Sequence, residues 1–207
     1  MAAYRSNMVS RHILKFIGLS LLALPSIGSA DSLNFLGVDQ ANVYQLNYNG
    51  QSEDVYVGSL NFSVNGSAPT ETFCVDLDHL ITAGQTYSVN TISTTTLPTS
   101  NAYRQAGDVL DAGIGTVTDA NHAAAMQIAI WQTVYGNNFS LTGVSSTVQS
   151  EATAYELAGA KFSGAATYYQ ENSGCGQSQV AAVPEPCSMA IFGIGAVGAF
   201  IRRKKRS

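Results

Sequence analysis

The stretch ANHAAAMQIAIWQTVY, residues 120–135, has apolar side chains at helical spacing and decides the class of fold. Asp119 or Asn121 can cap the N-terminus of this helix, and Gly136 ends it. So many apolar residues predict a helix that lies in the core. Its inward face carries Ala123, Gln127, Ile130, Trp131 and Val134.

The sequence before this helix predicts strands. Residues 44–48 alternate between apolar and polar side chains and run into Asn49-Gly50, a hairpin-turn pair. The alternation resumes after the turn and changes phase at Gly58, which predicts a β-bulge there. Two further strands are predicted at residues 72–77 and 86–89.

The sequence on either side of the central helix predicts two more helices. Residues 103–113 have helical spacing, and Ser145 or Ser146 can cap another helix that ends near Ala158. Strands first and helices second predict an α+β fold, an N-terminal antiparallel sheet or sandwich followed by a small helical subdomain. We place this domain at residues 31–165, and the Ser/Gly/Gln-rich sequence at 166–182 predicts a flexible linker.

The composition is that of a folded protein with an acidic body. The 207 residues are 45% apolar and 9% aromatic, enough for one domain with a core. Between the two chain ends, two basic residues, Arg104 and Lys161, stand against all fourteen acidic residues, a net charge of −12. A body this acidic repels phosphate, so nucleic-acid binding is excluded.

The N-terminus has the parts of a secretory signal peptide, predicted at residues 1–30. A basic segment runs to Lys15, an apolar segment covers residues 16–24, and small residues precede a cut between Ala30 and Asp31. A membrane anchor is disfavoured, because the apolar segment is far shorter than the roughly 20 residues that span a bilayer. We therefore expect export through the Sec pathway.

The C-terminus, residues 183–207, has three parts. Val183-Pro184-Glu185-Pro186 comes first, an apolar segment covers Met189–Ile201, and a cluster of arginine and lysine residues fills 202–206. As a helix the apolar segment would rise only about 20 Å, which suits transient membrane insertion of residues 187–201 better than a permanent span. An ordinary tail anchor is the alternative.

This three-part order resembles the PEP-CTERM sorting signal of exported proteins from Gram-negative bacteria. The resemblance implies processing by exosortase, a membrane transpeptidase that cuts near the Pro-Glu-Pro motif. It also implies transient anchoring in the inner membrane and a final location at the outer surface or in the extracellular matrix. Cys187 departs from the family's usual small or hydroxyl residue at that position.

Two residues of the middle region point to chemistry. Cys74 lies in a predicted strand, with Phe73 and Val75 on the opposite face, and Gln127 lies on the inward face of the central helix. A buried amide without partners costs about 1–3 kcal/mol, so a glutamine at that position requires a reason.

Phe73-Cys74-Val75 and Gln127-Ile128-Ala129-Ile130-Trp131 together resemble the thioester domains of bacterial surface adhesins, over roughly residues 35–160. The resemblance implies that the Cys74 sulfur attacks the Gln127 side-chain carbonyl, expels ammonia and leaves an internal thioester. A thioester is a stored acyl electrophile that an amine opens to an amide. Trp131, one turn from Gln127, would shield the bond, and His79 or His122 would assist proton transfer.

Less reactive alternatives remain for these residues. Cys74 can form a disulfide with Cys175, since export favours oxidation, or stay a buried free thiol. Gln127 can be a core amide bonded to the strand backbone. Asp76, Asp78 and His79 suggest a metal, but a solvated acidic edge is favoured, because no further ligand has suitable spacing.

The sequence therefore predicts an exported surface or matrix protein that adheres covalently to amine-bearing targets through Cys74 and Gln127. Attachment would be single-use, so we expect no enzyme activity, and no cofactor or metal is predicted. The alternative is a non-reactive structural protein of a biofilm matrix. The two differ in one property, because only the reactive protein takes up an amine at Gln127.

Overall fold

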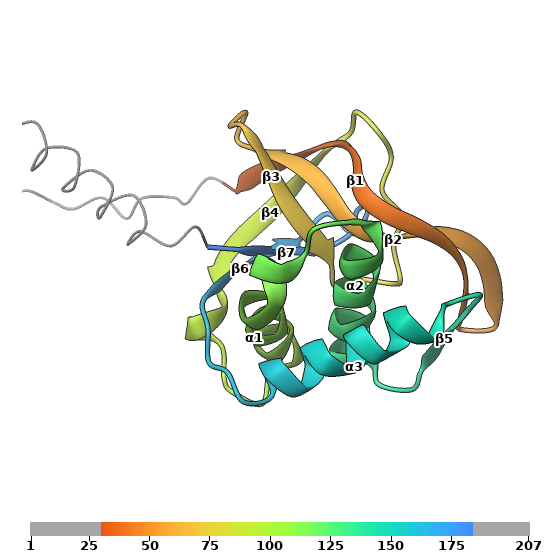
Figure 1. The fold of residues 1–207 in the computed structure, drawn as a ribbon. Helices are drawn as coiled ribbons and strands as arrows, with labels where there is room; N and C mark the ends of the chain where they lie inside the picture. Colours follow the sequence, from red (N-terminus) through yellow and green to blue (C-terminus); the bar gives the residue numbers. More distant parts are fainter. Residues whose placement is uncertain (1–29, 184–207) are drawn as a thin grey trace, which may run out of the picture.

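A computed structural model describes residues 30–183 of the chain (Figure 1). Four strands come first and the helices follow, as the sequence predicts; one short strand lies between the last two helices, and two more follow them. The helices are α1 (Ala102–Gly113), α2 (Ala120–Tyr135) and α3 (Ser146–Gly159). The strands are β1 (Asp31–Tyr48), β2 (Gln51–Val64), β3 (Pro69–Cys74), β4 (Thr86–Ser93), β5 (Phe139–Thr142), β6 (Ala166–Glu171) and β7 (Gln179–Ala182).

The seven strands form one antiparallel sheet that closes on itself. Its order is β2-β3-β7-β6-β4-β1-β5, and β1 also pairs with β2, so six strands make a ring and β5 extends β1 outside it. A cluster of buried residues drawn only from strands fills the ring, including Leu33, Phe62 and Val89. Closure leaves these six strands with partners on both sides, which a flat sheet cannot achieve.

A second cluster lies between the ring and the helices. Figure 1 shows the three helices together on one side of the strands. Buried residues of all three helices pack there against strand residues such as Phe73, Tyr168 and Val180. The predicted α+β class is therefore confirmed, and the sheet has the form of a ring with a helical layer on one side.

The predicted bulge at Gly58 lies in the β1–β2 hairpin. Val38 pairs with Leu60 and Ala41 pairs with Gly58, so the extra residue belongs to β1. Gly58 has a φ of 154°, and a Cβ atom at this position would overlap the Gln40 carbonyl oxygen. Only glycine fits here, since β1 approaches the backbone too closely for any side chain.

The prediction of a flexible linker at residues 166–182 is wrong. These residues form β6 and β7, which pair with each other and with β4 and β3. Tyr168 and Val180 are buried, so the segment completes both the ring and its core. The Ser/Gly-rich sequence is confined to the turn between two short strands, and it obscures the alternation on either side.

Both predicted address segments fall mainly outside the described residues. The residues outside the description include 1–29 of the predicted signal peptide, the sorting residues Pro184–Pro186 and the apolar segment predicted to insert into the membrane. Within residues 30–183, no helix is long and apolar enough to cross a bilayer.

Candidate functional site

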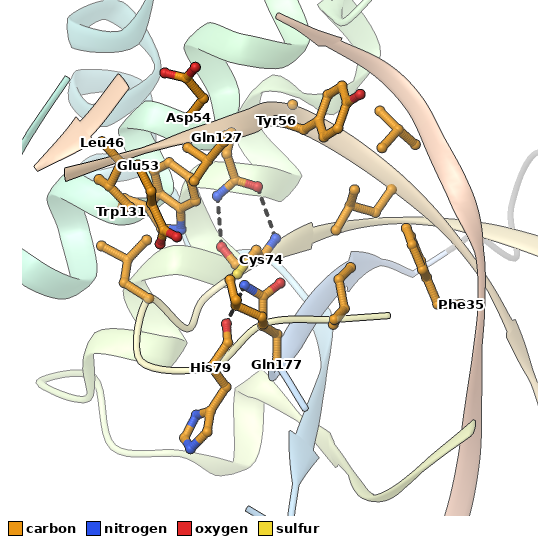
Figure 2. Close-up of a pocket in the computed structure, with 17 residues that line it drawn as sticks. Phe35, Leu46, Glu53, Asp54, Tyr56, Cys74, His79, Gln127, Trp131 and Gln177 are labelled. Carbon is orange, nitrogen blue, oxygen red and sulfur yellow. Dashed lines mark hydrogen bonds between the residues drawn. The ribbon is translucent and has the colours of Figure 1, made fainter. Parts of the chain in front are cut away.

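The fold brings Cys74 and Gln127 into direct contact, although 53 residues separate them in the sequence. The Cys74 backbone N–H donates to Gln127 Oε1 at 2.9 Å, and Gln127 Nε2 donates to the Cys74 carbonyl oxygen at 2.7 Å (Figure 2). Both residues are buried, with exposed fractions of 3% and 1%. The side-chain amide of Gln127 is therefore hydrogen bonded to the backbone of Cys74, the residue that the sequence pairs with it.

Gln127 occupies a place where β2 and β3 part. Leu60 of β2 pairs with Thr72 of β3, and the same register would set Gly58 opposite Cys74. This pair does not form. The pairing of β2 with β3 ends at Leu60, close to the bulge. The Gln127 amide supplies the acceptor and the donor that a strand would have offered to Cys74.

The Cys74 thiol is protonated and tied to the next turn of chain. Its Sγ donates to the Asp76 carbonyl oxygen at 2.8 Å and accepts from the Asp76 N–H at 3.2 Å. Burial raises the pKa of Cys74 to about 12, so the thiolate is scarce at neutral pH. Attack by this sulfur requires that its proton leave as the new bond forms.

The alternatives for the two residues fare differently. Among residues 30–183, Cys74 and Cys175 are both free, Cys74 buried and Cys175 exposed, and no disulfide joins them. Gln127 makes the hydrogen bonds expected of a core amide bonded to the strand backbone. These same bonds hold its side-chain carbonyl beside Cys74, so the geometry suits a satisfied core amide and a precursor of a thioester alike.

Trp131 packs one helical turn from Gln127 and lines the same cavity as Cys74. The side chain is 3% exposed, and its ring stands edge-on to Phe139 with centroids 6.0 Å apart. Figure 2 shows the indole beside Gln127 and Cys74, where a shield would have to lie. Its Nε1 has no hydrogen-bond partner within residues 30–183.

A cavity of about 350 Å³ opens next to the pair. Its walls are mostly apolar and come from the β1–β2 hairpin and from the loop between β3 and β4, with Leu46, Leu60 and Leu80 among the contributors. Glu53 and Asp54 line it as exposed acidic residues. A small cationic group can therefore approach Cys74 and Gln127 through a region of negative charge.

Neither histidine is oriented toward the pair. His79 lies in the loop after β3, bonded through Nδ1 to Asp76 Oδ2 at 3.0 Å, and Asp76 raises the pKa of His79. Its ring points away from Gln127 and Cys74 in Figure 2. His122 contacts Asp119 at the start of α2, more than a turn before Gln127. Within the described part of the chain, neither histidine is therefore placed for proton transfer at Gln127.

The predicted strand at residues 72–77 ends earlier, at Cys74, so Asp76 and Asp78 lie in a loop. Asp78 accepts from the Tyr48 hydroxyl at 3.0 Å, and Asp76 accepts from the Asp78 backbone N–H at 2.9 Å. The two carboxylates therefore organise this loop and do not lie on a strand. Among the described residues, no group of three potential ligands gathers around a metal position.

Sequence reasoning missed two residues that hold the loop over the cavity. The Tyr135 hydroxyl accepts from the Leu77 backbone N–H at 2.9 Å, and Gln177 Nε2 donates to the His79 carbonyl oxygen at 2.6 Å. Tyr135 was visible only as the last residue of a helix. Gln177 fell within the segment predicted as a linker, and no local pattern distinguishes it.

Comparisons with known proteins agree with the C-terminal prediction. Residues 182–206 match the family model of the PEP-CTERM protein-sorting motif. The chain therefore has the sorting signal of exported surface proteins, whose processing falls to exosortase-type machinery. No curated protein matches the chain.

Two solved structures are similar in fold. One is the N-terminal thioester domain of fibronectin-binding protein SfbI from Streptococcus pyogenes, with 10% identity and a TM-score of 0.43, covering 78% of this chain and 97% of that one. The other is the thioester domain of the Staphylococcus aureus TIE protein, with 15% identity and a TM-score of 0.41, covering 64% of this chain and 55% of that one.

Proposed function

We propose that this exported protein forms an internal thioester between Cys74 and Gln127 and uses it to attach covalently to amine-bearing targets. The observation that carries the proposal is the placement of the Gln127 amide on the Cys74 backbone, buried beside a cavity with acidic lining residues. Its location would be the outer surface or matrix of a Gram-negative bacterium. It would arrive by Sec export, with residues 187–201 transiently in the membrane.

The first step forms the bond. The Cys74 sulfur attacks the Gln127 side-chain carbonyl carbon, the C–N bond breaks, and the thiol proton leaves with the amide nitrogen as ammonia. The Cys74 N–H already donates to Gln127 Oε1, the atom that gains negative charge in the tetrahedral intermediate. This backbone donor favours attack on the Gln127 carbonyl.

The second step transfers the acyl group to the target. An amine attacks the same carbonyl carbon, the bond between this carbon and the Cys74 sulfur breaks, and an amide forms; the Cys74 sulfur takes up the proton that the amine gives up and is a thiol again. Burial of both residues limits the access of water to the bond. Each molecule reacts once, so the protein is a reactive binder and not a turnover enzyme.

A non-reactive structural role in the matrix is the second candidate. The observation that favours it is the complete pairing of the Gln127 amide with the Cys74 backbone, which satisfies the core without any covalent bond. In this case the residues stabilise the contact of α2 with β3 and do nothing more.

Amine labelling separates the two candidates. The exported protein is incubated with methylamine and digested, and the peptide that contains Gln127 is sequenced by mass spectrometry. Covalent adhesion predicts a methylamide at Gln127 and a new thiol at Cys74, with Gln179 as an unlabelled buried control. An unlabelled Gln127 would leave the structural role as the better account.

A further inference from the structure

A buried donor near Cys74 lacks an acceptor. Among the described residues, the Trp131 indole Nε1 is one of few buried side-chain polar atoms without a hydrogen-bond partner, and leaving such a group unpaired costs about 1–3 kcal/mol. Phenylalanine or leucine at this position would pack against Phe139 without a buried polar atom, so tryptophan is the less stable choice for packing alone. The indole N–H therefore lacks an acceptor among the described residues, and an acceptor that forms during a reaction would satisfy it.

The Cys74 sulfur is the nearby group that would need more hydrogen-bond donors during the reaction, because it gains negative charge as the thioester opens. Trp131 and Cys74 both line the cavity. Burial raises the pKa of the Cys74 thiol, and the indole N–H offsets a small part of that rise, although its interaction with the sulfur falls short of hydrogen-bond geometry. The Asp76 N–H already donates to the sulfur at 3.2 Å. The Asp76 carboxylate acts in the opposite direction and disfavours negative charge on the sulfur.

We propose that Trp131 is the leaving-group donor of the thioester, and that its indole N–H hydrogen bonds the Cys74 sulfur as amine attack releases it. The inference rests on the proposed function and deepens it. The amine nitrogen bonds to the Gln127 carbonyl carbon, the carbon–sulfur bond breaks, and its electron pair stays on sulfur. Trp131 and the Asp76 N–H hold this charge until the proton from the amine neutralises it.

A shield and a donor predict opposite results for Trp131→Phe. Loss of a shield admits water and other nucleophiles, so both hydrolysis and aminolysis become faster. Loss of a donor to a charged sulfur slows aminolysis, by roughly tenfold or more for one hydrogen bond to an ionised group. The direction of the change in aminolysis rate therefore identifies the role of Trp131.

The experiment follows methylamine uptake by intact mass, at fixed pH, in the exported wild-type protein and three variants. Trp131→Phe removes the N–H, Trp131→His restores a ring N–H, and Phe139→Leu loosens the packing of the indole while leaving its N–H in place. Because intact mass separates molecules with and without the thioester, the rate constant is measured on those that carry it, even where a variant forms less.

We expect Trp131→Phe to react at least tenfold more slowly than wild type, Trp131→His to recover part of the rate, and Phe139→Leu to stay within about twofold. A Trp131→Phe variant that reacts as fast as wild type, or faster, overturns the donor role and leaves the thioester standing. A slow variant that histidine does not rescue also overturns it, in favour of packing. A wild-type protein without any thioester refutes the proposed function and this inference together.

Discussion

Two buried glutamines flank Cys74, and they differ in what they do for it. Gln127 reaches Cys74 from α2 and exchanges two hydrogen bonds with its backbone. Gln179 pairs with Cys74 from β7, but its Oε1 accepts from Thr72 Oγ1 at 3.2 Å, and its Nε2 has no partner in the described part of the chain. Burial and chemical type are the same, so only the backbone contact distinguishes the amide that we propose to react.

The largest effect is expected from removing either proposed partner. Cys74→Ala and Gln127→Ala should each abolish covalent capture of an amine, because one half of the bond is gone. Capture is measured as a band that survives boiling in denaturant after incubation with an amine-labelled surface. Gln179→Ala is the matched control and should retain capture, and capture by either of the first two variants would contradict the assignment.

The same pair of glutamines should differ in stability. Gln127→Ala leaves the Cys74 N–H and carbonyl without partners, and we expect the free energy of unfolding to fall by about 2–4 kcal/mol. Gln179→Leu removes an amide that is only half bonded, so its cost should stay within about 1 kcal/mol. Urea unfolding of both variants measures the difference, and equal losses would show that the two amides are equivalent.

Gly58 tests how room is made for Gln127. A methyl group in Gly58→Ala would meet the Gln40 carbonyl and strain a positive φ, at a cost of about 1–3 kcal/mol. Gly66→Ala also has a positive φ, but it lies at a hairpin turn with open space around it, and its cost should be about 1 kcal/mol. Thermal unfolding compares the two, and an equal loss would argue against a special role for the bulge.

The smallest effect is expected from the loop after β3. Asp76 raises the pKa of His79 above its ordinary value of 6.5, so the folded state binds the proton more tightly than the unfolded chain does. The stabilisation is complete below pH 6.5 and is lost as the pH rises through the raised pKa. His79→Gln should flatten this part of the pH dependence of the unfolding free energy, and an unchanged slope would refute the assignment.

Sequence alone predicted α2 to the residue, because its ends have local causes. The Asp119 side chain accepts from the Asn121 and His122 backbone N–H groups, and Gly136 follows with a positive φ. The buried amide of Gln127 was visible for a similar reason, because it is a polar residue on an apolar helix face. Such signals lie within a few residues of the position that they describe.

Closure of the sheet was not predictable in this way. The ring depends on pairing of β1 with β4 and of β3 with β7, strands that are far apart in sequence and whose register no local pattern encodes. The strands β6 and β7 were not predicted, because each is too short to show a clear alternation. Gln177, which lies between them, was missed for the same reason. The cavity is lined by residues from β1, β2, α2 and two loops, and no local pattern predicts that these segments meet.

The mass of the exported protein, measured without reductant, tests the central claim most directly. The account predicts about 17 Da less than the mass calculated from the sequence, and about 14 Da more than that mass after methylamine treatment, with neither change in Cys74→Ala. A deficit of about 2 Da that reductant erases would indicate a disulfide instead. A mass equal to the calculated one before and after methylamine would contradict the thioester.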